Sequence, residues 1–454
     1  KNHSFMLLAA WEMTSGNSQV QEFNKSNLPN GIENATQSGI ERRISSNKGE
    51  WHSMAYMGRL HYAFKERYIL DVTVRRDGST RFGAANRWGT FPAVSAKWIL
   101  SDEAWFKDWE WFNMFGIRVG YGKTGRVPDY EYLHYARYNS SYGTEGGHNS
   151  YIDISTLHPA TIRLSNLKWE TATSYNLGFD VNLFDYKYNF DFNVFHETDN
   201  DLLFRDQTIP SSTGFGSISY INGGTLVKNG WELNFYTQNL VKAGNVTFDV
   251  NFNLANYNSK ITEMLPEILE SYQGEFVKTP NESRYVNRIQ LDNAYGSIYG
   301  LRYKGVYQWS DYVEGREGTS PVVRDAAGNV VTDAVGNPLP MYYDYGGINY
   351  KFRGGDAIYE DVNHDGTIDE LDVVYLGNCN PKIYGGFGFT VRWKDLSVNA
   401  FFNFRAGNKI ANYARMRAEN MYTNDNQSIA TNWRWRKEGD VTDMPRALYK
   451  YGYN

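Results

Sequence analysis

Apolar and polar residues alternate with a period of two in many segments along the chain. In residues 175–183, for example, Tyr175 and Leu177 alternate with Asn176 and Gly178. Successive side chains of a strand point to opposite faces of a sheet, so this period predicts a strand. We expect about eleven strands, near residues 5–11, 54–64, 68–75, 94–98, 117–121, 175–183, 188–194, 231–235, 246–254, 387–393 and 396–404.

The connections between these strands alternate between short and long. Short turns are predicted at residues 65–66, 185–187, 241–244 and 394–395, and long or charged connections separate them. Aromatic residues gather beside the short turns, at Phe64, Tyr68, Trp98, Trp105, Phe184, Tyr188 and Trp393. Outer-membrane barrels have short periplasmic turns, long extracellular loops and aromatic girdles. We therefore predict an all-β fold, a large antiparallel transmembrane β-barrel occupying residues 1–454.

The longest excursion from the predicted barrel covers residues 258–382, and the strand order places it on the extracellular side. Residues 14–50, 126–170, 199–228 and 406–454 are also expected to be loops. Eleven is an odd number, whereas single-chain bacterial barrels have an even number of strands. The chain also begins inside a predicted strand, so we expect both ends to continue into a longer protein.

Composition supports the barrel and excludes other classes. The 454 residues include 35 Tyr, 25 Phe, 13 Trp and 42 Gly, which suits a barrel with a thin apolar band. No run of about twenty apolar residues could form a spanning helix. The net charge of −5 gives no broad basic surface, so we expect no nucleic-acid partner. A soluble carbohydrate-binding β protein could have a similar composition, but it has no reason to sort its loops by length.

Several motifs, in order, resemble one protein family. They are RDGSTRFGAANRWGTFPAVSAKW at 76–98, SDEAWF at 101–106, IRVGYGKTG at 117–125, LKWETATSYNLGFDVNLF at 167–184, TDNDLLF at 198–204, VKNGWELNF at 227–235 and GDAIYEDVNHDGTIDELD at 355–372. Together they resemble the barrel of SusC/RagA-type TonB-dependent transporters of the Bacteroidota outer membrane. The resemblance covers nearly the whole chain.

This resemblance implies a function in nutrient import. It implies a barrel of about 22 strands that encloses a plug, energy supplied through TonB, and a SusD-like surface lipoprotein that captures oligosaccharides or oligopeptides. The plug, the TonB-contacting segment and the last barrel strands are not found in this sequence. The barrel would contact outer-membrane lipid.

The sharpest local motif is a twelve-residue pattern of oxygen-bearing side chains. Its predicted ligands are Asp361, Asn363, Asp365, Thr367 (through its carbonyl), Asp369 and Asp372, with Gly366 at position six. This is the spacing of an EF-hand calcium loop, in which carboxylate and amide oxygens converge on a hard cation. Asp372 stands where a bidentate Glu is usual. We predict a structural Ca²⁺ site; the alternative is a turn stabilised by its own Asx side chains.

Two other clusters have both a functional and a structural interpretation. The residues Arg75, Arg76, Asp77, Arg81, Asn86 and Arg87 could contact a ligand, but a hairpin tip and rim ion pairs already explain them. The loop residues Tyr130, Tyr132, Tyr135, Tyr138, Tyr142 and Tyr151 could stack on a substrate or pack against other loops. We favour a scaffold role for the first cluster and leave both readings of the second open.

No catalytic arrangement is found in the sequence. HExxH, GxSxG and phosphate-loop signatures are absent, and we expect the protein not to be an enzyme. The expected function is TonB-dependent import of oligomeric nutrients. The alternatives are a passive porin or adhesin barrel and, more remotely, a secreted glycan-binding protein.

Overall fold

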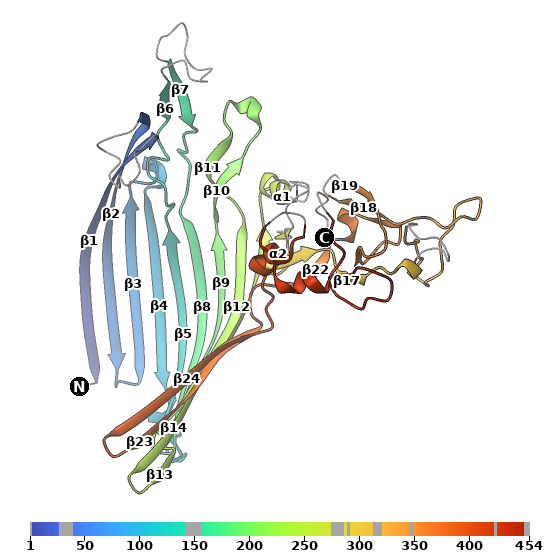
Figure 1. The fold of residues 1–454 in the computed structure, drawn as a ribbon. Coiled ribbons are helices and arrows are strands. Elements are labelled where there is room, and N and C mark those ends of the chain that lie inside the picture. Colours follow the sequence, from blue (N-terminus) through green and yellow to red (C-terminus); the bar gives the residue numbers. More distant parts are fainter. Residues whose placement is uncertain are drawn as a thin grey trace. The chain divides into compact units, whose positions relative to one another are not determined.

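The computed structural model describes residues 2–26, 40–141, 156–273, 286–287, 291–311, 320–345, 348–421 and 425–448. The chain forms two compact units (Figure 1). Unit 1 contains Lys1–Met264 and Gly385–Phe404, and unit 2 contains Leu265–Tyr384 and Arg405–Asn454. None of the helices in the described part has the length and apolar character needed to cross a membrane.

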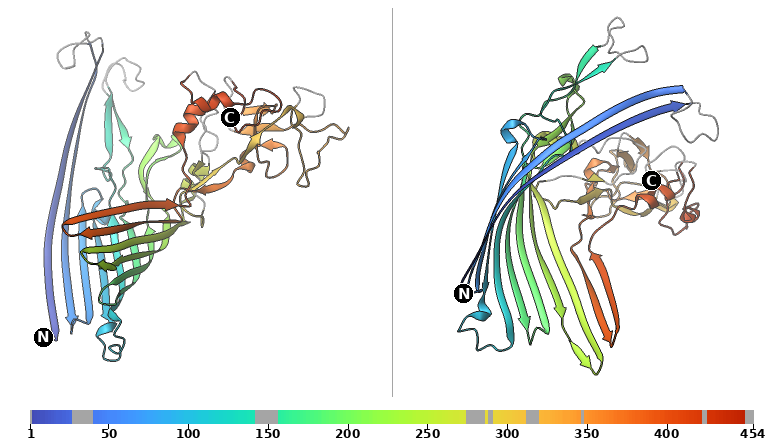
Figure 2. Two further views of the ribbon diagram at one scale, coloured as in Figure 1. Left: turned by 60° about the horizontal axis from the view of Figure 1, so that its bottom comes forward. Right: turned by 90° about the vertical axis from the view of Figure 1, so that its left-hand side faces the viewer.

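Unit 1 is built on one large antiparallel sheet, which Figure 2 shows from two further sides. Eleven strands follow one another across it: β1 (His3–Ser26), β2 (Ile40–Phe64), β3 (Tyr68–Ser79), β4 (Trp88–Ile99), β5 (Phe112–Arg126), β8 (Glu170–Leu183), β9 (Tyr188–Asn200), β12 (Thr225–Thr237), β14 (Val246–Glu263), β23 (Ile383–Trp393) and β24 (Leu396–Ala406). The short β13 (Val241–Ala243) pairs with β14. Each of the eleven contains one of the predicted segments, so the predicted fold class is confirmed.

The register of the sheet places the apolar residues of neighbouring strands on one face. Leu7 pairs with Leu60, Leu60 pairs with Val72, and Val72 pairs with Val94. Large apolar side chains on this face are exposed, and Leu7 is 81% exposed. An apolar surface of this extent is stable only when another apolar phase covers it. This face therefore suits contact with lipid.

Most connections sort by length in the described structure, as they do in the sequence. The connections beside β4 are the exception, because residues 80–87 at one end are fewer than residues 100–111 at the short-turn end. The short turns lie at the lower end of the sheet in Figure 1. In the β2–β3 turn, Lys65 and Glu66 adopt left-handed conformations with φ of 52° and 56°. Left-handed residues match the twist of a tight hairpin. The longest connections of the described sheet, residues 127–169, 201–224 and 264–382, leave from the other end.

The first hairpin differs from the prediction. Residues 14–50 were expected to form a loop, yet β1 continues to Ser26 and β2 begins at Ile40. The paired backbones satisfy each other's hydrogen bonds over this length, and that requires no apolar alternation. The prediction was wrong here because it depended on alternation alone.

The long connections of unit 1 contain two small hairpins and a shared core. The hairpins are β6 (Arg137–Ser141) with β7 (Thr156–Thr161), and β10 (Leu203–Thr208) with β11 (Ser217–Asn222). The core consists of Phe82, Leu133, Leu164, Leu167 and Tyr220. These residues come from three connections, so the loops support one another.

The described part of unit 2 contains short strands and two α-helices. The strands are β15 (Val286–Asn287), β16 (Ser297–Gly300), β17 (Tyr303–Val306), β18 (Tyr342–Tyr345), β19 (Ile348–Lys351), β20 (Ala357–Tyr359), β21 (Thr367–Ile368) and β22 (Val374–Asn378). The helices are α1 (Pro266–Gln273) and α2 (Tyr413–Glu419). Its buried core is formed by Tyr307, Val323, Met341, Tyr343, Phe352 and Ile368.

Two predicted boundaries around unit 2 differ from the structure. The excursion was expected to leave the sheet at Asn258, but β14 continues through Glu263. Residues 406–454 were expected to be a loop, yet they contain α2 and pack into unit 2. The Arg446 guanidinium lies 2.7 Å from the carboxylate of Asp356, which is fully buried. The two segments of unit 2 are thus joined by an ion pair whose two members are far apart in the sequence.

Candidate functional site

The predicted cation loop lies on the core of unit 2. Ile368, inside the loop, is a buried core residue. Gly366 adopts a left-handed φ of 82°, and a Cβ there would lie only 2.2 Å from Val323 Cγ2. Position six therefore needs glycine both for its conformation and for close packing. The short helix η6 (Glu370–Asp372) ends the loop.

The oxygen-bearing side chains of the loop bind its own backbone. Asp361 Oδ2 accepts from the Gly366 N–H at 2.9 Å, and Asp365 Oδ1 accepts from the Thr367 N–H at 2.8 Å. Asn363 Oδ1 likewise accepts from the Asp365 N–H at 3.1 Å. Such contacts are typical of a turn stabilised by its own Asx side chains, which is the alternative to a calcium site.

Asp372, at the twelfth position, is fully buried. Its two oxygens accept from the Val362 N–H at 2.7 Å and from the Asp369 N–H at 2.9 Å. Burial raises the pKa of the Asp372 carboxyl, and the two backbone hydrogen bonds oppose this rise. The carboxylate thus closes the loop by holding its first and last turns together.

The residues of the loop fit a hard cation in their chemistry. All six predicted ligands offer oxygen, and the buried Asp361 Oδ1 has no hydrogen-bond partner. As the chain stands, no three His, Cys, Asp or Glu side chains in its described part lie close enough together to hold a metal ion. Binding a cation would therefore require the carboxylates to exchange some backbone N–H contacts for the ion.

Two arginines of the hairpin tip, Arg75 and Arg81, are held by neighbouring groups. Arg75 Nε lies 2.9 Å from Asp77 Oδ1, and Arg81 donates to the Pro128 carbonyl at 3.0 Å. Arg81 also lies over the Trp51 ring, 5.1 Å from its centroid. These contacts support the scaffold interpretation.

The tyrosines of the β5–β8 connection divide into two groups. Tyr130 packs between Arg205 and Tyr220, as a loop contact would. Tyr135 and Tyr138 are exposed, the latter by 60%. Tyr142 and Tyr151 lie outside the described residues.

The polar face of the large sheet carries a charge network that the sequence analysis did not single out. Lys97 Nζ and Arg118 Nη2 lie 2.8 and 2.9 Å from the two oxygens of Asp180. Arg118 also lies 2.9 Å from Asp191. The four residues come from β4, β5, β8 and β9. The sequence does contain a signal for this network, because its charged residues alternate strictly with the apolar residues of their strands.

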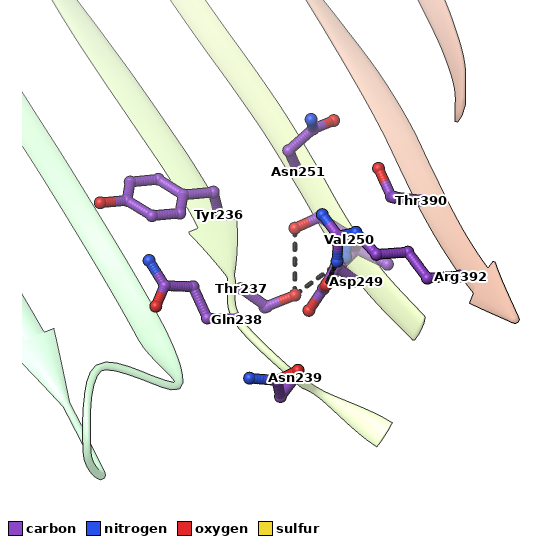
Figure 3. Close-up of a pocket in the computed structure, with 9 residues that line it drawn as sticks. All are labelled: Tyr236, Thr237, Gln238, Asn239, Asp249, Val250, Asn251, Thr390 and Arg392. Carbon is purple, nitrogen blue, oxygen red and sulfur yellow. Dashed lines mark hydrogen bonds and ion pairs between the residues drawn. The ribbon is translucent and has the colours of Figure 1, made fainter. Parts of the chain in front are cut away.

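A polar pocket lies on the same face at the short-turn end (Figure 3). Its volume is about 450 Å³, and it is lined by Tyr236, Thr237, Gln238, Asn239, Asp249, Val250, Asn251, Thr390 and Arg392. The Arg392 guanidinium lies 2.7 Å from Asp249 Oδ2. Thr237 is bound to the backbone of Val250, so it shapes the wall. The pocket therefore combines an ion pair with side-chain amides and hydroxyls.

Taken together, an antiparallel sheet with one apolar and one polar face, and with its longest connections at one end, defines a membrane-spanning β-barrel protein. Residues 3–321 match the family described as TonB dependent receptor-like, beta-barrel, and the chain belongs to this family. It is an outer-membrane protein, and the prediction of a SusC/RagA-type barrel is confirmed.

Named relatives are consistent with this assignment. The chain is 27% identical to TonB-dependent receptor P3 of Formosa agariphila over 90% of this chain and 37% of that protein. It is 31% identical to TonB-dependent receptor SusC of Bacteroides thetaiotaomicron over 46% of this chain and 21% of SusC. The chain spans about two fifths of the length of the Formosa relatives.

A solved structure shares the fold. The RagAB peptide importer in its closed-closed state matches with a TM-score of 0.70 at 20% identity. The match covers 100% of this chain and 45% of that one. At this identity the likeness establishes the fold alone.

Proposed function

We propose that the protein takes part in the import of oligomeric nutrients, glycans or oligopeptides, across the outer membrane. Energy would come through TonB, and a SusD-like surface lipoprotein would be the capture partner. Membership of the TonB-dependent receptor family supports this role. The names of SusC and of the RagAB peptide importer point to the same class of function.

The observation that carries the proposal is the continuous polar face of the sheet. Several charged side chains there are paired with one another, as in the Lys97–Asp180–Arg118 network. Arg59 and His61 in β2 similarly meet Asp71 in β3, at 2.8 and 3.0 Å. A polar wall on which such charges are paired can line an aqueous passage. No reaction is assigned to it.

Uptake by cells tests the proposal. A strain lacking the gene, and the same strain with the gene restored, would be given fluorescent neutral hexasaccharides and fluorescent pentapeptides. We expect accumulation of one class only when the gene is present and TonB is functional. Uptake that persists without TonB would instead support a passive porin. Equal uptake with and without the gene would refute the proposal.

We further propose that residues 361–372 bind a structural Ca²⁺ ion. Asp361, Asn363, Asp365, Asp369 and Asp372 would supply side-chain oxygens and Thr367 its carbonyl. The unpartnered Asp361 Oδ1 and the glycine at position six support this. The ion would tie the loop together from outside the core, which is a stabilising role.

Calorimetric titration of the purified full-length protein tests this site. Addition of Ca²⁺ should release heat in the wild type, and the signal should be lost in Asp361→Ala. The matched control is Asp325→Ala, because Asp325 is also an exposed Asx-turn residue in unit 2. If wild type and Asp361→Ala give the same trace, the loop is an Asx turn and not a calcium site.

A further inference from the structure

The connection between β4 and β5 differs from the other turns at its end of the sheet. Residues 100–111 form the longest described connection at this end, and they lie beyond the ends of the two strands (Figure 2). Trp105, Trp109 and Trp111 are exposed there, the first by 61%. Large aromatic side chains of this kind normally pack in a core or meet another apolar phase.

The turn folds onto the apolar face of the sheet. Val94 in β4 belongs to this face and pairs with Tyr121 in β5. Phe115 lies an even number of residues before Tyr121 in the same strand, so it points to the same face. Phe106, a buried residue of the turn, stacks on Phe115 with ring centroids 5.8 Å apart. Since the polar face lines the interior of a barrel, the turn lies on the outside.

A carboxylate of the turn binds the polar atoms of neighbouring aromatic residues. Glu103 accepts from the Tyr68 hydroxyl at 2.6 Å and from Trp98 Nε1 at 3.0 Å. Arg67 also donates to Glu103, at 2.8 Å. Tyr68 and Trp98 are paired across β3 and β4, with ring centroids 6.3 Å apart. The turn is therefore fixed to the aromatic residues at the short-turn edge of the apolar face.

The exposed rings continue the apolar face beyond the ends of the strands. Trp109 and Trp111 lie with centroids 6.2 Å apart and ring planes within 9° of each other. Trp111 also lies 6.2 Å from the ring of Phe184, an exposed residue of the β8–β9 turn. Tryptophan gathers at membrane–water interfaces because its ring is apolar and its N–H needs a polar partner. Continuity with the lipid-facing surface thus points to the headgroup layer as the phase that covers these rings.

The charges of the turn distinguish between lipid headgroups. Its exposed charged residues are three acids and one base: Asp102, Asp108, Glu110 and Lys107. Glu103 is paired with Arg67 and adds no free charge. A surface with an excess of carboxylates repels anionic headgroups and attracts ammonium groups. An ammonium group also binds favourably over the face of a tryptophan ring.

We propose that residues 101–111 form a membrane foot, a turn that sits in the phospholipid headgroup layer and favours zwitterionic lipids with an ammonium group over anionic lipids. The layer is that of the periplasmic leaflet, because short turns face the periplasm in barrels of this class. By contrast, the β12–β14 connection at residues 238–245 contains no aromatic residue, and we expect it to lie in water. This inference goes beyond the proposed import function and does not depend on it.

Fluorescence quenching by labelled lipid tests the position of the turn in the full-length protein. In a cysteine-free background that includes Cys379→Ser, Ala104→Cys carries a fluorophore on the foot and Ala243→Cys carries it on the β12–β14 connection; both alanines are exposed. Nanodiscs of phosphatidylcholine and phosphatidylethanolamine would be made with and without a nitroxide on the headgroup. We expect the nitroxide to quench position 104 roughly twofold more than position 243, because tryptophan holds the turn at headgroup depth. Equal quenching would overturn the foot.

Removal of exposed rings tests what places the turn. Trp105→Ala combined with Trp109→Ala should lower the quenching at position 104 to the level at position 243. Trp433→Ala is the matched control, because it removes an exposed tryptophan of unit 2 and should change nothing. All three side chains are exposed, so their loss should leave the fold intact. Undiminished quenching in the double variant would mean that the rings do not place the turn.

A change of lipid charge tests the headgroup preference. When phosphatidylglycerol replaces phosphatidylethanolamine, quenching at position 104 should fall roughly twofold or more, because the anionic surface repels the acidic turn. Asp108→Asn combined with Glu110→Gln should restore it. The control is Glu66→Gln combined with Asp395→Asn, which removes two exposed acids from other short turns and should restore nothing. Quenching that does not depend on lipid charge would refute the preference for an ammonium group.

Access to the labelled position gives a further way to reject the foot. A position 104 thiol that a maleimide cannot reach in detergent would show that another protein segment covers the turn, and this would overturn the lipid assignment. The cellular uptake assay is independent of all these measurements, so failure of the foot and failure of the import function can be told apart.

Discussion

At the scale of single residues, burial of a phenylalanine stabilises the outer connections of unit 1 more than the charged residues beside it do. Phe82 lies between two arginines, Arg81 and Arg87, that draw attention in the sequence. Phe82 itself is fully buried and stacks on Trp169 with ring centroids 4.8 Å apart. The phenylalanine belongs to the small core that these connections share.

Phe82→Ala should loosen these connections. Truncation of a buried phenylalanine costs about 3–5 kcal/mol, because contacts are lost and a cavity remains. The large sheet does not depend on this core, so the loss should be local. Limited proteolysis in detergent should cut residues 127–169 faster in Phe82→Ala than in the wild type or the exposed-site control Arg76→Ala. Unchanged cleavage would show that the cluster contributes little.

Gly366→Ala should disturb the cation loop without removing any oxygen ligand. The new methyl group would meet Val323, and the left-handed φ of 82° disfavours alanine. We expect a lower melting temperature for unit 2 and, if the loop binds Ca²⁺, a smaller shift on its addition. Gly328→Ala is the control, since φ is 85° there but no atom lies within 4 Å. The same melting temperature for both variants would mean that strain, not packing, dominates.

At the scale of elements, alternation predicted each of the eleven main strands. A strand with one face toward lipid and the other toward water must alternate apolar and polar residues, as Tyr175 and Asn176 do. The pattern is therefore clear in the sequence. Alternation failed for residues 14–50, where both sides of the hairpin are polar. It also missed the pocket, because Asp249 and Arg392 are neighbours only after β14 and β23 pair. Contacts between residues that are far apart in the sequence cannot be predicted from its periodicity.

Two turns in unit 2 repeat one structure and should respond to acid. Asp325 and Asp333 each accept from the backbone N–H two and four residues later. Hydrogen bonds, first of all those from Asn329 and Asn337, hold both aspartate pKa values below the ordinary value of 3.8. A lowered folded pKa means that the stabilisation is complete above about 3.8 and is lost as the pH falls through the folded value.

Amide hydrogen exchange across this range tests the prediction. The N–H groups of Ala327 and Val335 should exchange faster as the pH falls below 3.8, after correction for intrinsic rates. Asp325→Asn should remove the pH dependence from the first turn only. A wild-type profile without any step would contradict the role of these carboxylates.

At the scale of the whole molecule, unit 2 depends on an ion pair between its two segments. Arg446→Leu would leave the fully buried Asp356 carboxylate without its partner, apart from the Arg353 N–H at 2.7 Å. Removing one member of a buried pair costs about 3–5 kcal/mol. Chemical denaturation should show that unit 2 unfolds earlier, while the large sheet is unchanged. The double variant Asp356→Asn with Arg446→Leu should recover part of the loss.

The orientation of the barrel is a second prediction at this scale. Short turns face the periplasm in barrels of this class, and long connections face outward. In a Cys379→Ser background, a membrane-impermeant maleimide should label Ser212→Cys, between β10 and β11, on intact cells. Lys394→Cys, in the β23–β24 turn, should react only after the outer membrane is opened. The reverse pattern would invert the assignment of the two ends.

The length of the first hairpin has a consequence for what reaches the cell. At about 3.3 Å per residue, the 24 residues of β1 extend for roughly 80 Å, whereas a tilted strand needs only about 9–11 residues to cross the membrane. With the orientation predicted above, the polar half of this hairpin stands well clear of the lipid. It would then be among the first protein surfaces that an antibody or a phage meets, so selection for escape should act on its sequence more than on that of the neighbouring strands.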